Sequence, residues 1–313
     1  MGDAVDVHQH LWSDTLVDRL RARSQPPYLR GWTLHLDGER PFEVDPTAHD
    51  VAARVAADEA DGVGSAVVGI SSPLGVEDLR STSAGPLLAA YHADVEALPG
   101  HFRAWASVAA DPDLDQLRHR LGTSRYVGLQ VPATHLTTPA AWERAGALLD
   151  VVAAQGSVLF VHPGPEPARP GARDLPAWWA PTVGYTAQLQ AAWWAWHAAG
   201  VRGDHPRLRV LFAAGAGLAP LLRERQALRD PEGLLARGVV DPHVYLDTSG
   251  HGPRALESLV RVVGIDALAL GSDRPYAAPL DHLLDPAATH AVRVTNPHRL
   301  LDGAGRHLEG ARP

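Results

Sequence analysis

Two histidines near the start of the chain, His8 and His10, have a spacing that suits metal binding. They follow a short run of alternating apolar residues, 4–7. If that run is a β-strand, side chains two positions apart point the same way, so both imidazoles face one side and Gln9 faces the other. Roughly one His-x-His pair is expected by chance in 313 residues with 17 histidines, so the pair alone is weak. Its weight depends on further ligands elsewhere in the chain.

Two further candidate ligands follow later apolar segments. His162 comes directly after residues 158–161, and Asp273 closely follows residues 267–271. In a barrel of parallel strands, catalytic groups gather at the carboxyl ends of the strands. His8, His10, His162 and Asp273 could therefore meet at one rim and bind one divalent ion. Zinc is the metal that such a set binds most readily, with a coordination position left for water or substrate.

The segments that must position these ligands alternate with stretches of helical periodicity. This alternation is typical of a parallel sheet with crossover helices. The apolar segments cover residues 5–7, 66–70, 103–108, 127–131, 158–161, 210–213, 244–247 and 267–271. Eight such units predict an α/β fold, a (β/α)8 TIM barrel, with residues 1–313 forming a single domain. Asp111-Pro112, Thr138-Pro139 and Gly252-Pro253 predict helix starts after the third, fourth and seventh strands.

The segment between the first two strands, about residues 12–62, is far longer than an ordinary βα loop. We predict that it is an insertion with its own structure. Ser13 could cap a helix that runs through Arg23. Residues 32–36 and 39–44 flank Asp37-Gly38 and predict a β-hairpin with a two-residue turn. We expect this insertion to cover one barrel mouth as a lid.

Composition excludes several kinds of chemistry and partner. The net charge of −8, without a cluster of arginines, argues against nucleic acid and favours a small-molecule substrate. No apolar run approaches the length that spans a bilayer, and no signal segment is recognisable, so a cytoplasmic location without membrane contact is expected. Without cysteine there is no disulfide, thiolate ligand or cysteine nucleophile. All 28 basic residues are arginine, so Schiff-base chemistry and a carbamylated-lysine bridge between two metals are also excluded.

Three motifs in this order and spacing resemble the amidohydrolase superfamily. They are residues 5–12 (VDVHQHLW), 160–164 (FVHPG) and 271–275 (GSDRP), and Asn296-Pro297 resembles the start of a closing helix. The similarity is to the amidohydrolase-related (amidohydrolase 2) branch, which includes aminocarboxymuconate-semialdehyde decarboxylase. The resemblance implies that His8, His10, His162 and Asp273 bind one divalent metal ion. Because the chain has no lysine, only a mononuclear site is supported.

The chain departs from this family after the sixth strand. There the resemblance implies a histidine that polarises substrate or water, but residues 213–217 read AAGAG. Such a general acid or base typically contributes about 10²- to 10⁴-fold in rate. His251, after the seventh strand, is the nearest replacement by chain position. Asp273 is the second candidate catalytic group, as both a metal ligand and a proton relay.

Three residues are candidates for binding substrate, and each has an equal structural alternative. Arg274 could pair with a substrate carboxylate through two hydrogen bonds, or form a salt bridge across the rim. Trp12 could form an apolar wall, or pack in the core beneath the insertion. His135 could line the pocket after the fourth strand, or lie on the surface.

The hypothesis placed first is a metal-dependent hydrolase of the amidohydrolase-related family that acts on a small organic substrate bearing a carboxylate. The alternative is non-oxidative decarboxylation of an aromatic or muconate-type acid. A third hypothesis is a degenerate barrel that binds a ligand without turnover, because the histidine of the sixth strand is missing. The surplus of tryptophans, nine in the chain, would also suit a homodimer interface.

Overall fold

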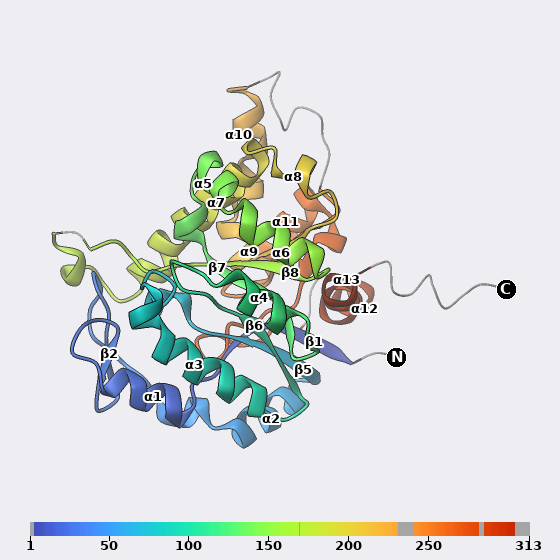
Figure 1. The fold of residues 1–313 in the computed structure, drawn as a ribbon. Helices are drawn as coiled ribbons and strands as arrows, with labels where there is room; N and C mark the ends of the chain where they lie inside the picture. Colours follow the sequence, from blue (N-terminus) through green and yellow to red (C-terminus); the bar gives the residue numbers. More distant parts are fainter. Residues whose placement is uncertain (1–2, 169, 231–240, 282–284, 304–313) are drawn as a thin grey trace.

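A parallel sheet of eight strands forms the centre of the computed structural model, which describes residues 3–168, 170–230, 241–281 and 285–303 (Figure 1). All eight predicted segments contain a strand. The strands, in both chain order and sheet order, are β1 (Ala4–His10), β5 (Val63–Gly69), β6 (Phe102–Ala106), β7 (Tyr126–Pro132), β8 (Val158–His162), β9 (Arg209–Phe212), β10 (Val244–Asp247) and β11 (Leu268–Ala269).

Backbone hydrogen bonds between β1 and the segment at and after β11 close the sheet into a (β/α)8 barrel. The amide of Val7 donates to the carbonyl of Leu270 over 2.9 Å, and the amide of Asp273 donates to the carbonyl of His8 over 2.8 Å. A third bond joins the amide of His10 to the carbonyl of Arg274 over 2.7 Å. The closure therefore falls where the first and last predicted metal ligands lie.

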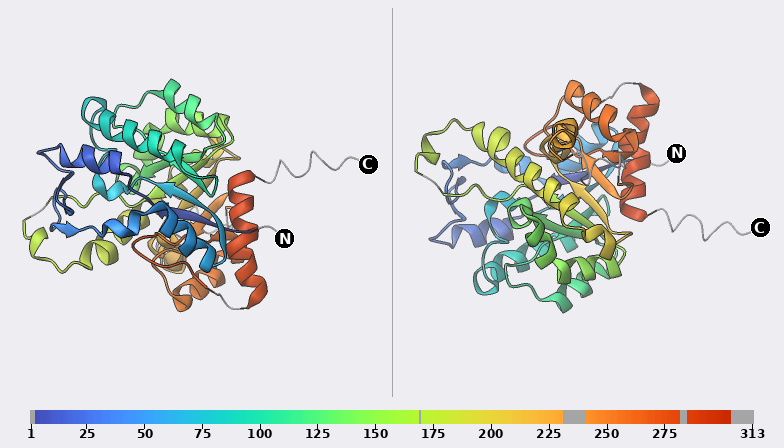
Figure 2. Two further views of the ribbon diagram at one scale, coloured as in Figure 1. Left: turned by 90° about the horizontal axis from the view of Figure 1, so that it is seen from below. Right: turned by 90° about the horizontal axis from the view of Figure 1, so that it is seen from above.

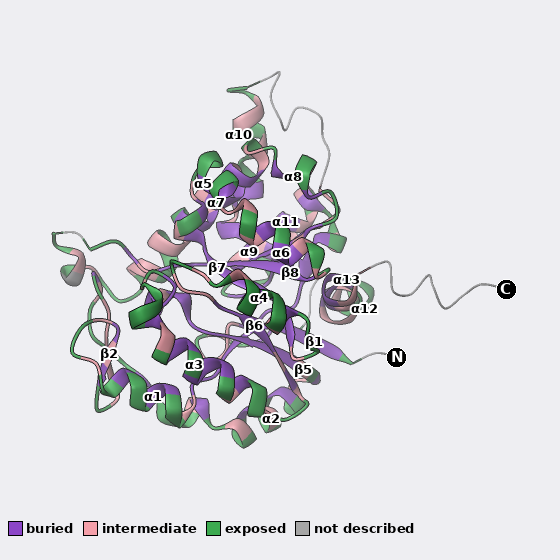
Figure 3. Ribbon diagram, in the orientation of Figure 1, coloured by how far each residue is buried: buried purple, intermediate pink, exposed green. Residues whose placement is uncertain are grey.

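Helices cover the outside of the barrel, and the strands between them are buried (Figure 3). The helix predicted after the third strand begins at Leu114, capped by Asp113, slightly later than expected, whereas those at Pro139 and Pro253 begin as predicted. The helices are α1 (Asp14–Arg21), α2 (Val51–Ala60), α3 (Ser81–Ala97), α4 (Leu114–Leu121), α5 (Pro139–Arg144), α6 (Gly146–Ala154), α7 (Tyr185–Ala198), α8 (Val201–Asp204), α9 (Ala214–Gly217), α10 (Arg223–Ala227), α11 (Pro253–Val263), α12 (Pro286–His290) and α13 (Asn296–Asp302).

Large aromatic side chains fill the barrel interior beneath the predicted ligands. Trp105 and Phe160 are fully buried, and their ring centroids are 4.9 Å apart. The Trp105 indole donates to the carbonyl of Val7 over 3.0 Å, which fixes it to β1. The Phe160 ring centroid lies 5.0 Å from that of His8. A rigid apolar floor therefore supports the histidines from below.

The insertion contains the predicted helix and hairpin, but its turn differs from the prediction. Ser13 caps α1 by accepting from the amide of Leu16, and the helix ends at Arg21. The antiparallel sheet has three strands, β2 (Tyr28–Arg30), β3 (Thr33–His35) and β4 (Phe42–Glu43). Residues 36–41 connect β3 to β4, so the expected two-residue turn at Asp37-Gly38 is wrong.

That connection is long because it reaches another loop. Gly38, with φ of +76°, packs so tightly that an added Cβ would lie 2.9 Å from the backbone of Ala168. The insertion and the loop that follows β8 lie side by side at one end of the barrel, as two views agree (Figure 2). In the described part of the chain, no helix has the length and apolar character that crossing a membrane requires.

Candidate metal centre

The four predicted ligands meet at the carboxyl ends of the strands. One ligand atom from each of His8, His10, His162 and Asp273 lies within 4.8 Å of all the others. The Nε2 atoms of His8 and His10 are 3.2 Å apart, and Asp273 Oδ1 lies 3.3 Å from the first and 3.1 Å from the second. Ligand atoms around a tetrahedral ion with bonds of about 2.0 Å are roughly 3.3 Å apart. The spacing therefore suits direct coordination of one ion.

Hydrogen bonds orient each histidine so that its Nε2 faces this centre. Nδ1 of His8 lies 2.7 Å from Asp247 Oδ2, Nδ1 of His10 lies 2.9 Å from the carbonyl of Gly69, and Nδ1 of His162 lies 2.8 Å from the carbonyl of Pro163. These oxygens only accept, so each neutral ring carries its proton on Nδ1 and has a lone pair on Nε2. Lone pairs that face one another and a carboxylate repel unless a cation lies between them. The donor set therefore fits a divalent metal.

The ionisation of the histidines is consistent with this set. Burial, together with His8 and His10, holds the pKa of His162 well below its ordinary value, so this ring is neutral, as a ligand must be. Burial lowers the pKa of His8, but the carboxylates of Asp247 and Asp273 outweigh it and raise the pKa to about 8. Without metal, the His8 ring is therefore largely protonated near pH 7.

Asp247, which sequence reasoning did not select, is the carboxylate that supports His8. It ends β10 and is fully buried. Its Oδ1 accepts from the amides of Ala214 (2.8 Å) and Ser249 (3.0 Å) and from the Ser249 hydroxyl (2.6 Å), which leaves Oδ2 for His8. Burial raises the pKa of Asp247, but His8 and these donors outweigh it and hold the pKa below its usual value. An acidic residue at the carboxyl end of a barrel strand was the available signal.

The cavity above this centre has a volume of about 700 Å³ and mainly apolar walls. Trp12 lines it, although most of its surface is packed away and its ring stacks on His49 with centroids 5.1 Å apart. Leucines and aromatic residues from the insertion, the β8 loop, α7 and the segment after β11 form much of the wall: Leu34, Leu36, Phe42, Leu175, Trp179, Leu189 and Tyr276. Asp273 exposes 30% of its side chain, far more than His8 at 2%. Asp273 is thus the more accessible of these two groups.

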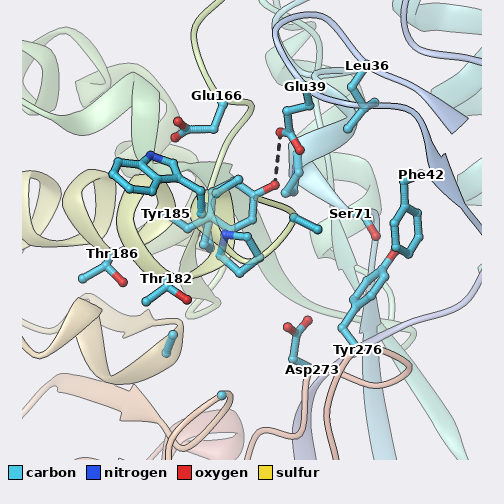
Figure 4. A pocket seen from close by; sticks show the side chains of 18 of the residues that line it. Leu36, Glu39, Phe42, Ser71, Glu166, Thr182, Tyr185, Thr186, Asp273 and Tyr276 are labelled. Atoms are coloured by element: carbon cyan, nitrogen blue, oxygen red, sulfur yellow. Dashed lines mark hydrogen bonds between the residues drawn. The ribbon is translucent and has the colours of Figure 1, made fainter. Parts of the chain in front are cut away.

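Polar groups gather on the opposite wall. The Tyr185 hydroxyl donates to Glu39 Oε1 over 3.2 Å, and the Gln188 amide donates to Glu166 Oε1 over 3.0 Å. Burial raises the pKa of Glu39. Figure 4 shows Glu39, Tyr185 and Glu166 across the cavity from Asp273. Sequence reasoning missed this wall because its residues lie in the insertion, the β8 loop and α7, away from the strand ends where catalytic groups were expected.

The structure does not bring Arg274 or His135 to the cavity, which corrects their expected substrate-binding role. The guanidinium of Arg274 pairs with Asp58 and Asp61. Arg274 therefore forms a salt bridge at the rim, which was the structural alternative for this residue. His135 pairs with Asp78 at the surface. Both side chains are therefore engaged by carboxylates of the chain itself.

The position of the missing histidine lies in α9, whose residues form a left-handed turn and not a regular helix. Residues 214–218 all have positive φ, from 44° at Ala214 to 62° at Leu218. Such a conformation costs roughly 1–2 kcal/mol for each residue that carries a side chain. The bonds from the Ala214 amide to Asp247 and Ser249 help to hold the turn. His251 does line the cavity, and its Nε2 lies 2.9 Å from the carbonyl of Ala214.

Known proteins resemble this chain in sequence and in fold, although no protein-family model matches it. It is 30% identical to 2-amino-3-carboxymuconate-6-semialdehyde decarboxylase of Caenorhabditis elegans over 135 residues, which are 40% of this chain and 33% of that protein. The resemblance to aminocarboxymuconate-semialdehyde decarboxylase is therefore confirmed as a sequence similarity over part of the chain. The matches to the curated relatives span 33% and 46% of the relatives' own length.

Solved structures align along nearly the whole chain. Metarhizium anisopliae IDCase in apo form has a TM-score of 0.79 at 17% identity, covering 96% of this chain and 97% of that chain. The dihydroxybenzoic acid decarboxylase from Polaromonas sp. JS666, with bound manganese and the inhibitor 2-nitroresorcinol, has a TM-score of 0.67 at 17% identity, covering 96% and 97%. Similarity at this level establishes the barrel fold.

Proposed function

We propose that this protein is a metal-dependent, non-oxidative decarboxylase of a small aromatic or muconate-type acid. The observation that carries the proposal is the convergence of His8, His10, His162 and Asp273 at the floor of a largely apolar cavity. A planar unsaturated ring suits such walls, and its carboxylate would face the metal centre. Hydrolysis, the first hypothesis from sequence, would use the same ligands. The curated relatives, however, are named as decarboxylases, which favours the alternative.

The metal would be held by these four residues. When bound, it supplies positive charge that binds the substrate carboxylate and stabilises negative charge that develops during the reaction. Three imidazoles and a carboxylate favour Zn²⁺. Mn²⁺ is the alternative, because the Polaromonas neighbour contains manganese.

The reaction needs one proton at the carbon that loses its carboxyl group. The bond from that carbon to the carboxyl group breaks, carbon dioxide leaves, and the electron pair forms the new bond to hydrogen. Asp273 is our candidate proton carrier, because its carboxyl group is partly exposed to the cavity. His251 is the second candidate. A neutral His251 ring uses its Nε2 proton for the carbonyl of Ala214, which makes that proton less available.

The wall opposite the metal centre selects the rest of the substrate. Glu39 and Glu166 accept hydrogen bonds, so hydroxyl or amino groups on the ring would be favoured there. A carboxylate placed against these two glutamates would be disfavoured, so the second carboxylate of a muconate-type acid would lie away from this wall. The proposed substrate therefore has the carboxylate that is lost at the metal centre and hydrogen-bond donors at the end that meets the glutamates.

A substrate panel tests this proposal. Metal-loaded protein would be incubated with carboxyl-labelled dihydroxybenzoates, 2-amino-3-carboxymuconate semialdehyde, benzene dicarboxylates, a lactone and an anilide. We expect release of labelled carbon dioxide from an acid with donor groups, lost on chelation and restored by Zn²⁺ or Mn²⁺. Cleavage of only the lactone or anilide would support the hydrolase instead. Binding of these acids without turnover would support the third hypothesis, a ligand-binding barrel.

A further inference from the structure

Gln9, between the two metal-binding histidines, lies at the centre of a buried polar network behind the metal centre. The side chain is fully buried. Its Nε2 donates to Asp6 Oδ2 and to Asp58 Oδ1, each over 2.9 Å. Its Oε1 accepts from Arg54 Nη1 over 3.0 Å, and the same nitrogen donates to the carbonyl of His10 over 3.1 Å. Helix α2, which carries Arg54 and Asp58, is thus bonded to the back of the histidine pair.

The same network reaches the segment that carries Asp273. Asp58 Oδ1, already bound to Gln9, also pairs with Arg274 Nη1. The carbonyl of Arg274 accepts from the amide of His10, and its amide donates to Ser272 Oγ over 3.1 Å. The residues on both sides of Asp273 are therefore anchored, one of them through a charged side chain.

A second carboxylate joins the two segments directly. Asp6 Oδ1 accepts from the amide of His8 and from the amide of Ser272, each over 3.0 Å. Asp6, in β1, and Asp58, in α2, thus link β1 to its neighbours, and both are fully buried. Buried carboxylates are costly unless each has partners, so a network of this kind holds its members in one arrangement.

Asp273 is the ligand that most needs such support. Its φ of +61° places it in the left-handed region, which an aspartate tolerates but does not prefer. Its carboxylate must nevertheless lie about 3 Å from two imidazole nitrogens, as the distances of 3.3 and 3.1 Å show. A small rotation of the backbone at this residue would move the carboxylate away from the histidines.

We infer that the ion pair of Asp58 and Arg274 positions the metal centre by coupling Gln9, between His8 and His10, to the backbone that presents Asp273. The inference rests on the metal centre of the proposed function. Neither residue would touch metal or substrate, so both are positioning residues. Asp61, the outer partner of Arg274, exposes 32% of its side chain and should matter little.

The test compares metal binding by the full chain and by its variants Asp58→Asn, Arg274→Gln and the double variant, with Asp61→Asn as the matched control. Zn²⁺ affinity would be measured by competition with a chromophoric chelator. The visible spectrum of the Co²⁺ form would report ligand geometry, and the melting temperature of chelator-treated protein would report the scaffold.

We expect each single variant to bind Zn²⁺ about 10- to 100-fold more weakly, the range typical of groups that orient metal ligands. The Co²⁺ spectrum should change in both. The double variant should bind no more weakly than the worse single one, because both substitutions break one coupling. Asp61→Asn should stay within about threefold of the unaltered protein. If Asp58→Asn does not fold, the Zn²⁺ affinities and Co²⁺ spectra of Arg274→Gln and Asp61→Asn alone test the inference.

Unchanged Zn²⁺ affinity and Co²⁺ spectra in the single variants, with only a lower melting temperature, would show a scaffold role and overturn the inference. Additive losses in the double variant would overturn it too, because independent effects add. Failure of the unaltered protein to bind Zn²⁺ or Co²⁺ is a distinguishable result. It would overturn the proposed metal centre, and the inference with it.

Discussion

Replacing Asp247 by asparagine should strongly weaken metal binding, although the two side chains have nearly the same size. Three hydrogen bonds, from the amides of Ala214 and Ser249 and from the Ser249 hydroxyl, require an acceptor at the Oδ1 position. An asparagine that keeps them must place its oxygen there. Its NH₂ group then takes the Oδ2 position, 2.7 Å from Nδ1 of His8.

This exchange turns an acceptor into a donor at the position that sets the tautomer of His8. The ring can meet the new N–H only by giving up its Nδ1 proton and carrying one on Nε2, the atom that faces the metal. Groups that support metal ligands typically contribute 10- to 100-fold in affinity, about 1.4–2.7 kcal/mol. Because the substitution also inverts the hydrogen bond, we expect a loss near the upper end of that range.

The assay is competition for Zn²⁺ between the protein and a chromophoric chelator, with circular dichroism as a check on folding. Ser249→Ala is the matched control, because it removes one donor to Oδ1 and leaves Oδ2 free to accept from His8. It should change affinity by less than about threefold. A folded Asp247→Asn protein that binds Zn²⁺ within about twofold of the unaltered chain would refute the reasoning.

Three further predictions concern strain, acid stability and proton transfer. Ala214→Gly should stabilise the metal-free protein by about 0.5–1 kcal/mol in urea unfolding, because Ala214 has φ of +44°; Ala213→Gly, at φ of −64°, should destabilise it instead. Burial lowers the pKa of His92 from 6.5 to about 3. Below pH 6.5 the unfolded chain therefore binds a proton that the folded one does not, and stability falls. From pH 6.5 to 5.0 the metal-free protein should lose about 1.5–2 kcal/mol more than His92→Gln; equal losses would contradict this. At saturating metal, Asp273→Asn should lower kcat at least about 10²-fold and His251→Gln less than about tenfold; the reverse order would make His251 the proton donor.

The barrel could be predicted because its strands carry their own signal. Segments such as β8 (Val158–His162) are continuous apolar runs between helical stretches, a pattern that a strand buried on both faces requires. The order of the strands then follows from the fold. That order places residues at the carboxyl ends together, which is why four candidate ligands from distant segments could be predicted to meet. The same rule pointed to the end of β10, where Asp247 was overlooked.

Side-chain partners across the rim could not be predicted in this way. Arg274 follows a metal ligand directly and was expected to meet substrate, but its direction depends on Asp58 and Asp61 of a segment more than two hundred positions earlier. The loop after Leu36 was expected to turn tightly at Gly38. It instead extends to pack against the β8 loop, a contact that no local pattern records.

The most direct test of the proposed decarboxylase measures where deuterium and ¹⁸O from the solvent enter the product. Metal-loaded protein would convert an acid of the panel in deuterium oxide enriched in ¹⁸O. Decarboxylation predicts release of carbon dioxide and an organic product with one deuterium at the carbon that carried the carboxyl group. An organic product that keeps its carboxyl group and gains ¹⁸O at a cleaved bond would show hydrolysis and contradict the account.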